Sequence, residues 1–188
     1  HSASSAASDV YKRQVYRNSD PSDIVVTAAG GLVGEVVQVW KPKQLNTFET
    51  EWGFSCMGYE ISGALGIKMA KPDQDVVVFV GDGSYLLNNT DIYSSVIYDQ
   101  KLIIIVCDNG GHMVINRLQL AKGGKEYICN LRAARATNLR FVDFENHAKS
   151  MGANAETVSS TSELEAAYRR AKDLSLIHIS EPTRQHAI

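Results

Sequence analysis

Residues 76–84 read Val-Val-Val-Phe-Val-Gly-Asp-Gly-Ser, and residues 102–111 read Leu-Ile-Ile-Ile-Val-Cys-Asp-Asn-Gly-Gly. Each apolar run is short and rich in β-branched residues, which is typical of a strand buried on both faces of a parallel sheet. Polar residues follow each run, and ligands of open α/β sheets gather at the carboxyl ends of such strands. The two stretches therefore predict a doubly wound α/β fold, with a mostly parallel sheet and helices on both faces.

The residues at these two strand ends suit an anion that is held through a divalent cation. Asp82 offers a carboxylate and Asn109 an amide oxygen, and such hard oxygen ligands suit an octahedral Mg²⁺. The neighbouring glycines leave backbone N–H groups open to a phosphate. The expected ligand is therefore a metal-bridged diphosphate.

Strand and helix signals alternate through the rest of the chain. The predicted strands are residues 24–27, 76–80, 102–107 and 155–158. The predicted helices are residues 32–40, 57–70, 85–98, 143–151 and 162–172. One face of the second helix would carry Met57, Ile61, Leu65 and Met69, and a capping box of Ser162 and Glu165 would begin the last helix.

Residues 112–140 interrupt this alternation because they lack a clean strand. They are expected to form either a helix and mobile loop over the site or a helix whose charges face water. His147, on the helix after this region, is expected to be a surface or structural histidine rather than a proton carrier.

The two ends of the chain read differently from its middle. Residues 4–14 and 174–184 look like in-frame translations of the transposon adapters used to prepare sequencing libraries. We therefore expect residues 1–14 and 174–188 to be non-native tails, and residues 15–173 to be a fragment of a longer protein.

Composition supports one globular domain, since the 188 residues are 44% hydrophobic and 21% charged. The formal net charge of -2 gives no electrostatic reason to bind nucleic acid. No apolar stretch approaches the roughly 20 residues that span a bilayer. The three cysteines, Cys56, Cys107 and Cys129, lack metal-ligand spacing and indicate a reduced, cytoplasmic setting.

Three stretches carry a family resemblance: residues 51–60 (EWGFSCMGYE), 78–85 (VFVGDGSY) and 107–111 (CDNGG). The Gly-Asp-Gly-Ser turn, with Asp-Asn after the next strand, resembles the diphosphate-binding signature of thiamine diphosphate enzymes. The surrounding residues are similar to the bacterial trihydroxycyclohexane-1,2-dione hydrolases of inositol breakdown, across nearly all of residues 15–173. The resemblance is to their C-terminal cofactor domain, which in those enzymes accompanies an N-terminal pyrimidine-binding domain and a central domain.

This resemblance implies two cofactors, thiamine diphosphate and Mg²⁺, and a role for each matching residue. The Mg²⁺ ligands would be the Asp82 carboxylate, the Asn109 side chain and the Gly111 carbonyl. The diphosphate would lie against the turn of Gly81, Gly83 and Ser84, with His112 and the Ala29–Gly31 turn as weaker candidates.

Further residues would contact the rings of the cofactor or its surroundings. Met57 would wedge between the two rings, and the carbonyl of Ser55 would accept a hydrogen bond from the pyrimidine amino group. Many relatives have glycine in place of Ser55, but this departure keeps the backbone carbonyl. Asp108 stands where the broader family often has asparagine, and it would order the turn or contact substrate.

The implied reaction is hydrolysis of a carbon–carbon bond in a cyclic 1,2-diketone, trihydroxycyclohexane-1,2-dione, to give 5-deoxy-glucuronate. No catalytic residue is expected in this chain, because in the family the glutamate that activates the pyrimidine comes from the N-terminal domain of another subunit. We therefore expect a homo-oligomer, a dimer or tetramer with a shared site, and no activity from the isolated fragment.

Two alternatives share parts of this pattern. An acetohydroxyacid synthase or another thiamine diphosphate-dependent decarboxylase would carry the same diphosphate signature. A noncatalytic nucleotide- or flavin-binding module would favour a Gly-x-Gly-x-x-Gly turn after the first strand, and residues 28–34 (AAGGLVG) do not have that spacing.

Overall fold

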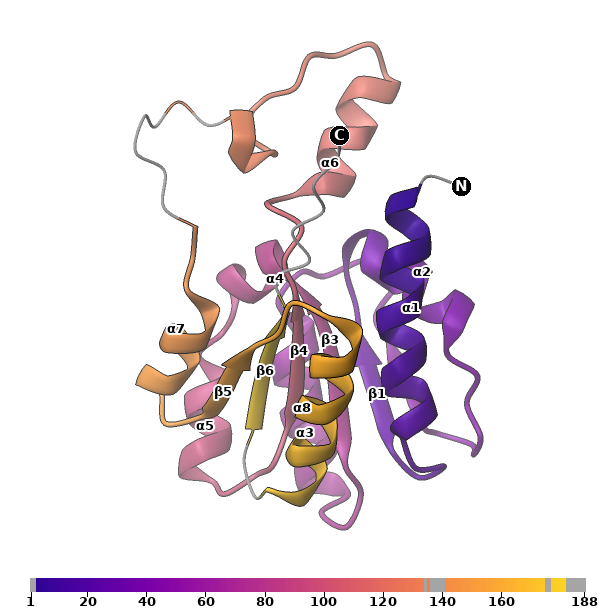
Figure 1. Ribbon diagram of the computed structural model, residues 1–188, viewed down its shortest axis with the longest axis vertical. Helices are drawn as coiled ribbons and strands as arrows, with labels where there is room; N and C mark the ends of the chain where they lie inside the picture. The colour runs from indigo at the N-terminus through magenta and orange to yellow at the C-terminus, as the bar shows by residue number, and fades with distance from the viewer. Residues whose placement is uncertain (1–2, 134, 136–140, 175–176, 182–188) are drawn as a thin grey trace.

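A computed structural model describes residues 3–133, 135, 141–174 and 177–181. Six parallel strands form one sheet in the order β2-β1-β3-β4-β6-β5 (Figure 1). Their bounds are β1 (Ile24–Thr27), β2 (Phe48–Thr50), β3 (Val76–Gly81), β4 (Ile103–Cys107), β5 (Asn154–Thr157) and β6 (Ile177–Glu181). The predicted α/β fold is confirmed, and every strand pair described is parallel.

Helices cover both faces of this sheet. One face carries α1 (Ala3–Asn18), α2 (Gly30–Val39) and α8 (Thr161–Asp173). The other carries α3 (Tyr59–Ala70), α4 (Asp82–Leu87), α5 (Asp91–Ile97) and α7 (Phe144–Ser150). Successive side chains of β3 enter opposite cores, Val78 on the side of α3 and Phe79 on the side of α8, as strand geometry requires.

The segment α6 (Met113–Ala121) and the 3-10 turn Leu131–Ala133 extend beyond the carboxyl ends of the strands, at the top of Figure 1. No helix among the described residues has both the length and the apolar character needed to cross a membrane.

The predicted helix at residues 85–98 is wrong as a single element, because it is broken between α4 and α5. Asn88 is extended there, with φ -151°. Its side-chain nitrogen Nδ2 donates to the Gly58 carbonyl and to the Ser62 hydroxyl, at 3.2 and 2.9 Å. A tertiary contact with α3 therefore ends α4, which the local pattern of the sequence did not indicate.

Of the four apolar residues predicted to share one face of the second helix, Ile61 and Leu65 are buried and the two methionines are not. Met57 precedes the helix and Met69 lies on its outer side, with exposed fractions of 37% and 56%. The helix begins only after Gly58, whose φ of 92° is left-handed. The buried residues of the helix are Glu60, Ile61, Ala64, Leu65 and Lys68.

The cap of α8 lies two residues before the predicted one. The hydroxyl of Ser160 accepts from the Glu163 N–H at 3.2 Å, and the Glu163 carboxylate accepts from the Ser159 N–H at 2.7 Å. The predicted Ser162–Glu165 box is therefore wrong, and Glu165 pairs with Arg169 one turn later. The short strand β2 was not predicted either, since its Phe-Glu-Thr sequence has no apolar run.

The described parts of the two predicted tails, residues 3–14 and 177–181, form regular structure. Helix α1 runs without a break across residues 14 and 15 and packs on α8 and α2. Strand β6 pairs with β4 on one side and with β5 on the other. Their origin as translated adapters stays a prediction.

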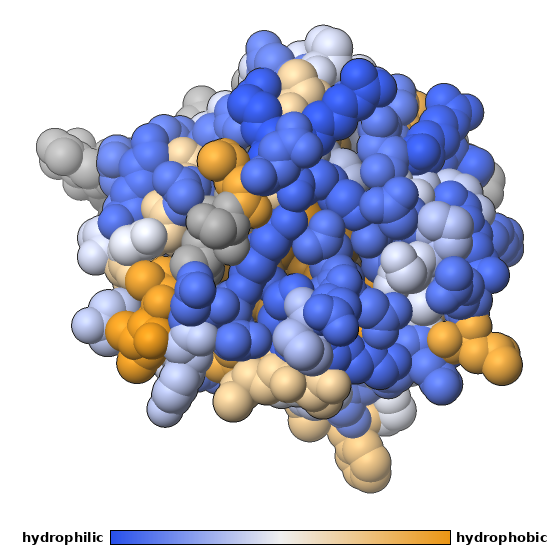
Figure 2. Space-filling view, turned by 90° about the horizontal axis from the view of Figure 1, so that it is seen from below, coloured by the Kyte–Doolittle hydropathy of each residue, from blue (hydrophilic) through white to orange (hydrophobic). Residues whose placement is uncertain are grey.

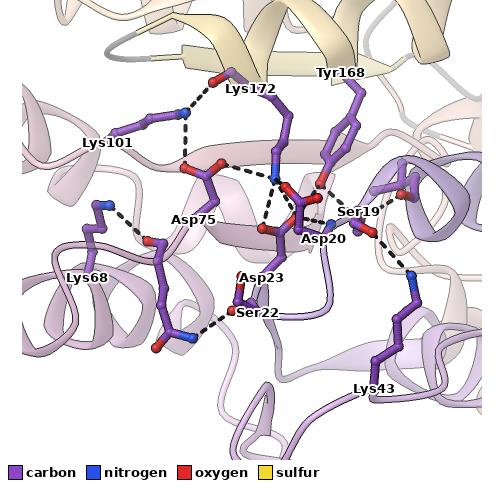
Figure 3. Close-up of polar contacts among 12 residues, drawn as sticks. Ser19, Asp20, Ser22, Asp23, Lys43, Lys68, Asp75, Lys101, Tyr168 and Lys172 are labelled. Carbon is purple, nitrogen blue, oxygen red and sulfur yellow. Dashed lines mark hydrogen bonds and ion pairs between the residues drawn. The ribbon is translucent and has the colours of Figure 1, made fainter.

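An ionic network lies at the amino ends of the strands (Figure 3). The ammonium of Lys172 on α8 contacts carboxylate oxygens of Asp20, Asp23 and Asp75 at 2.7, 2.7 and 3.2 Å. Asp75 also pairs with Lys101 at 3.0 Å. Figure 2 shows this end of the molecule as mostly hydrophilic. The network fastens α8 to the loops that enter β1 and β3, at the end of the sheet opposite the predicted site.

Candidate functional site

The pairing of β3 with β4 brings the two predicted strand ends together. Gly81 is the register partner of Cys107, so Asp82 and Asp108 leave the sheet side by side. The Asp82 carboxylate accepts a hydrogen bond from the Gly111 N–H at 2.7 Å. The structure therefore places two of the three predicted metal ligands, Asp82 and Gly111, in direct contact.

The environment of Asp82 is suited to a cation. Asp82 is only 4% exposed. Burial, and then the negative charge of Asp108, raise the pKa of the Asp82 carboxyl to about 6. A divalent cation would offset both effects, because it stabilises the ionised carboxylate and screens it from its neighbour. The residues present therefore fit Mg²⁺.

The other predicted ligands sit at the same edge. Asn109 is exposed and is the second residue after β4. The Gly111 carbonyl accepts from the Met113 N–H at 3.0 Å, so a metal would have to share that oxygen. Among the described residues, no cluster of three or more His, Cys, Asp or Glu side chains is arranged to hold a metal. The predicted set, with one carboxylate, one amide and one carbonyl, is not such a cluster, and its role stays a prediction.

His112 lies against the predicted diphosphate turn. A Cβ atom added to Gly83 would come within 2.6 Å of the His112 imidazole, so the ring covers this glycine. Further along α6, a Cβ on Gly31 would meet the Arg117 guanidinium at 2.6 Å. The start of α6 thus lies over both the turn after β3 and the turn after β1.

A third loop tip joins the site through Gly58. Its N–H donates to the Ser84 hydroxyl at 2.7 Å, which brings the Met57–Gly58 segment against the turn after β3. Met57 therefore directly precedes Gly58, the residue that contacts the turn after β3. Ser55 belongs to a loop folded around Glu51, whose carboxylate accepts from the Phe54 and Cys56 N–H groups. No described hydrogen bond joins Ser55 to Asp82 or Ser84.

The region after β4 is tied back onto the site at its base. Gly111 forms a β-bridge with Asn130, and the Leu131 N–H donates to the Gly110 carbonyl at 3.0 Å. The Glu126 carboxylate binds the side-chain amides of Asn116 and Asn130. The predicted helix is confirmed as α6, the mobility of the loop stays a prediction, and residues 134 and 136–140 lie outside the described part.

Two further residues at or near the site were not identified from the sequence. Glu60 is buried on α3 and binds three donors of the site. A charged residue within the inward stripe of a helix was the signal that could have identified it. Tyr85 is fully buried, and its hydroxyl contacts Nδ1 of His147 at 2.9 Å. His147 therefore has a structural contact, in line with the expectation for it.

The matching family model is described as the thiamine pyrophosphate enzyme C-terminal TPP binding domain, and it covers residues 28–179. The chain belongs to this family. The TPP-binding domain assignment agrees with the site, because its loop tips after β1, β3 and β4 all lie within the matched residues.

Three sequence relatives of this TPP-binding domain carry the same name, 3D-(3,5/4)-trihydroxycyclohexane-1,2-dione hydrolase. The protein of Halalkalibacterium halodurans is 40% identical over 153 residues, that of Lacticaseibacillus casei is 40% identical, and that of Bacillus subtilis is 37% identical. Each match covers 81% of this chain but 24% of the relative. The chain thus spans about a quarter of the length of these relatives.

A solved structure supports the fold of the TPP-binding domain. The thiamine diphosphate-dependent 4-hydroxybenzoylformate decarboxylase of Rhodococcus jostii RHA1 superposes with a TM-score of 0.77 at 18% sequence identity. The match covers 93% of this chain and 32% of the decarboxylase. At this identity, the likeness concerns the fold alone.

Proposed function

We propose that this chain is the cofactor-binding part of a thiamine diphosphate- and Mg²⁺-dependent hydrolase that opens the ring of trihydroxycyclohexane-1,2-dione to give 5-deoxy-glucuronate. The observation that carries the cofactor proposal is the contact of Asp82 with Gly111 at 2.7 Å, beside the Asp108 carboxylate. The substrate is proposed from the shared name of relatives that are about 40% identical. We also propose a cytoplasmic homo-oligomer whose subunits share each site.

In this proposal, the chain's residues bind and orient the cofactor. Asp82, Asn109 and the Gly111 carbonyl would hold Mg²⁺, and the metal would bridge to the diphosphate. The N–H groups of Gly83 and Ser84, at the start of α4, would donate to the diphosphate, with His112 alongside. The chemistry that thiamine diphosphate supplies when bound is a nucleophilic carbon and a sink for the electrons of a breaking carbon–carbon bond.

The remaining residues would shape the space for the rings. Met57 would hold the two rings apart, and the Ser55 carbonyl would orient the pyrimidine amino group. The glutamate that activates the pyrimidine is proposed to lie outside this chain and to be contributed by a partner subunit. The 188-residue chain alone is therefore expected to bind cofactor without turning over substrate.

The test compares this chain with a full-length protein made by restoring the upstream reading frame. With thiamine diphosphate and Mg²⁺, the restored protein should consume the cyclic diketone and release an open-chain acid, whereas the 188-residue chain should not. Consumption of pyruvate without opening of the diketone would favour a decarboxylase instead. Calorimetry should detect thiamine diphosphate binding only with Mg²⁺ present, and no binding of mononucleotides.

Mg²⁺ affinity should rise with pH through about 6. The metal binds the ionised Asp82 carboxylate, and the pKa of this group is raised to about 6, so protons compete with the metal below that pH. Affinity should fall by about tenfold for each pH unit below 6 and level off above it. Calorimetric titration with Mg²⁺ alone between pH 5 and pH 8 measures this. In Asp108→Asn, which removes the neighbouring charge, the midpoint should move to lower pH, and an unmoved midpoint would contradict the assignment.

A further inference from the structure

A buried carboxylate joins the three loop tips of the site. Glu60, at the start of α3, is 1% exposed. Its oxygens accept from the Ala29 N–H at 3.2 Å, the Gly58 N–H at 3.0 Å and the Ser84 hydroxyl at 2.7 Å. These donors come from the turn after β1, the residue before α3 and the turn after β3. One side chain thus holds three segments that are separate in sequence.

The position of this carboxylate is where a ligand of such a sheet is expected. The strand order β2-β1-β3 means that the chain leaves β1 toward one edge of the sheet and returns to β3 on the other side. Ligands of doubly wound sheets bind at this reversal, outside the carboxyl ends of the two strands. Ala29 follows β1 and Ser84 follows β3, so the Glu60 hydrogen bonds span the reversal.

Both hydrogen bonds of the Ser84 hydroxyl are made to groups of the protein. It donates to Glu60 and accepts from the Gly58 N–H at 2.7 Å. A buried carboxylate depends on such donors, since losing one leaves part of its charge unsatisfied. Hydrogen bonds to an ionised acceptor are also stronger than neutral ones. Ser84 therefore offers a ligand its backbone N–H, while its side chain fixes the direction of that group.

We infer that Glu60 is a positioning residue of the cofactor site, which holds the Ala29, Gly58 and Ser84 tips in the arrangement that the diphosphate meets. The inference rests on the proposed function, because it assigns Glu60 to the same pocket. Glu60 acts through Ser84 and Gly58 and does not touch the reacting atoms.

Two effects of Glu60 on an anion have opposite signs. Its hydrogen bonds organise the donors, whereas its negative charge repels a diphosphate. Glu60→Gln changes the hydrogen bonds and the charge at once, but Ser84→Ala removes the hydrogen bond between Ser84 and Glu60 without changing any charge. A double-mutant cycle of these two substitutions cancels the charge effect, because that effect is present in both arms that carry Glu60→Gln.

The experiment measures thiamine diphosphate affinity, with saturating Mg²⁺, for the 188-residue chain and for Ser84→Ala, Glu60→Gln and the double variant. Ser84→Ala should weaken binding by about fivefold in the presence of Glu60 and by less than about twofold in Glu60→Gln. An equal loss of affinity in both backgrounds would mean that the Ser84 hydroxyl contacts the ligand directly. No loss in either background would mean that the hydrogen bond between Ser84 and Glu60 does not affect binding. Each outcome overturns the inference. Ser95→Ala is the matched control, since this buried hydroxyl bonds to the Ile92 carbonyl within α5, and affinity should stay unchanged.

A measurement without ligand separates this inference from the proposed function. Amide hydrogen exchange at Ala29 or Gly58 should speed up by about tenfold in Glu60→Gln, because the two N–H groups donate to different carboxylate oxygens and glutamine keeps only one acceptor oxygen. Unchanged exchange at both amides overturns the role of Glu60 alone. If both the parent chain and the restored full-length protein fail to bind thiamine diphosphate, the proposed function is overturned, and the role of Glu60 toward the cofactor is overturned with it.

Discussion

Asp82→Ala is expected to abolish Mg²⁺-dependent binding of thiamine diphosphate, with a loss of affinity of about a hundredfold or more. Asp82 is the only carboxylate in the proposed ligand set, and its position beside Gly111 places it where the strand ends after β3 and β4 meet. The diphosphate depends on the metal for its attachment, so losing the metal also removes most of the attraction for the anion. Calorimetry with thiamine diphosphate at several Mg²⁺ concentrations measures both losses.

Two further variants separate the charge of Asp82 from its shape. Asp82→Asn keeps an oxygen that can accept from the Gly111 N–H but removes the charge, so its affinity should still fall by at least about tenfold. Asp73→Ala removes an exposed carboxylate near the opposite end of β3 and changes net charge equally, so it should leave affinity unchanged. If Asp82→Ala remains folded and binds as tightly as the parent, the proposed metal site is wrong.

Lys172→Met is expected to lower the free energy of unfolding by about 3 kcal/mol without weakening cofactor affinity. Burial tends to lower the pKa of Lys172, but hydrogen bonds to Asp20 and Asp23 outweigh it and raise this pKa. Asp23 is only 3% exposed, and burial raises the pKa of its carboxyl. Without the ammonium, the buried Asp23 and the half-buried Asp75 would be like charges with one fewer cation between them. Urea unfolding of both chains measures the loss.

Lys149→Met is the matched control for this prediction. Lys149 pairs with Glu145 at 2.6 Å on α7, but its side chain is 48% exposed. Such a surface pair contributes at most about 1 kcal/mol, because water screens it. An equal loss of unfolding free energy in the two variants would show that the network at the amino ends of the strands stabilises the fold no more than a surface ion pair does. A fall in thiamine diphosphate affinity for Lys172→Met would contradict the separation of the network from the site.

Several features of the site followed from the sequence because the strand signals and the polar residues after each strand are local. The register of β3 and β4 required only that two apolar runs pair in parallel, and Asp82 and Gly111 then had to meet at one edge. The break in the helix after Leu87 did not follow, because Asn88 ends it through contacts with Gly58 and Ser62, residues 30 and 26 positions earlier. Met57 lies outside α3 because the left-handed Gly58 delays the start of the helix.

The sequence by itself determined the buried strands and the polar residues that follow them, because a strand covered on both faces must be apolar throughout and its end must turn. Only the tertiary structure decided what Glu60 and Lys172 do. Each is a charged residue on a helix, a pattern that ordinarily indicates a solvated side chain. Their partners lie up to 31 positions away for Glu60 and up to 152 for Lys172. The physical reason is that burial and pairing of a charge depend on which distant segments the fold brings together, whereas strand formation depends on neighbours in the chain.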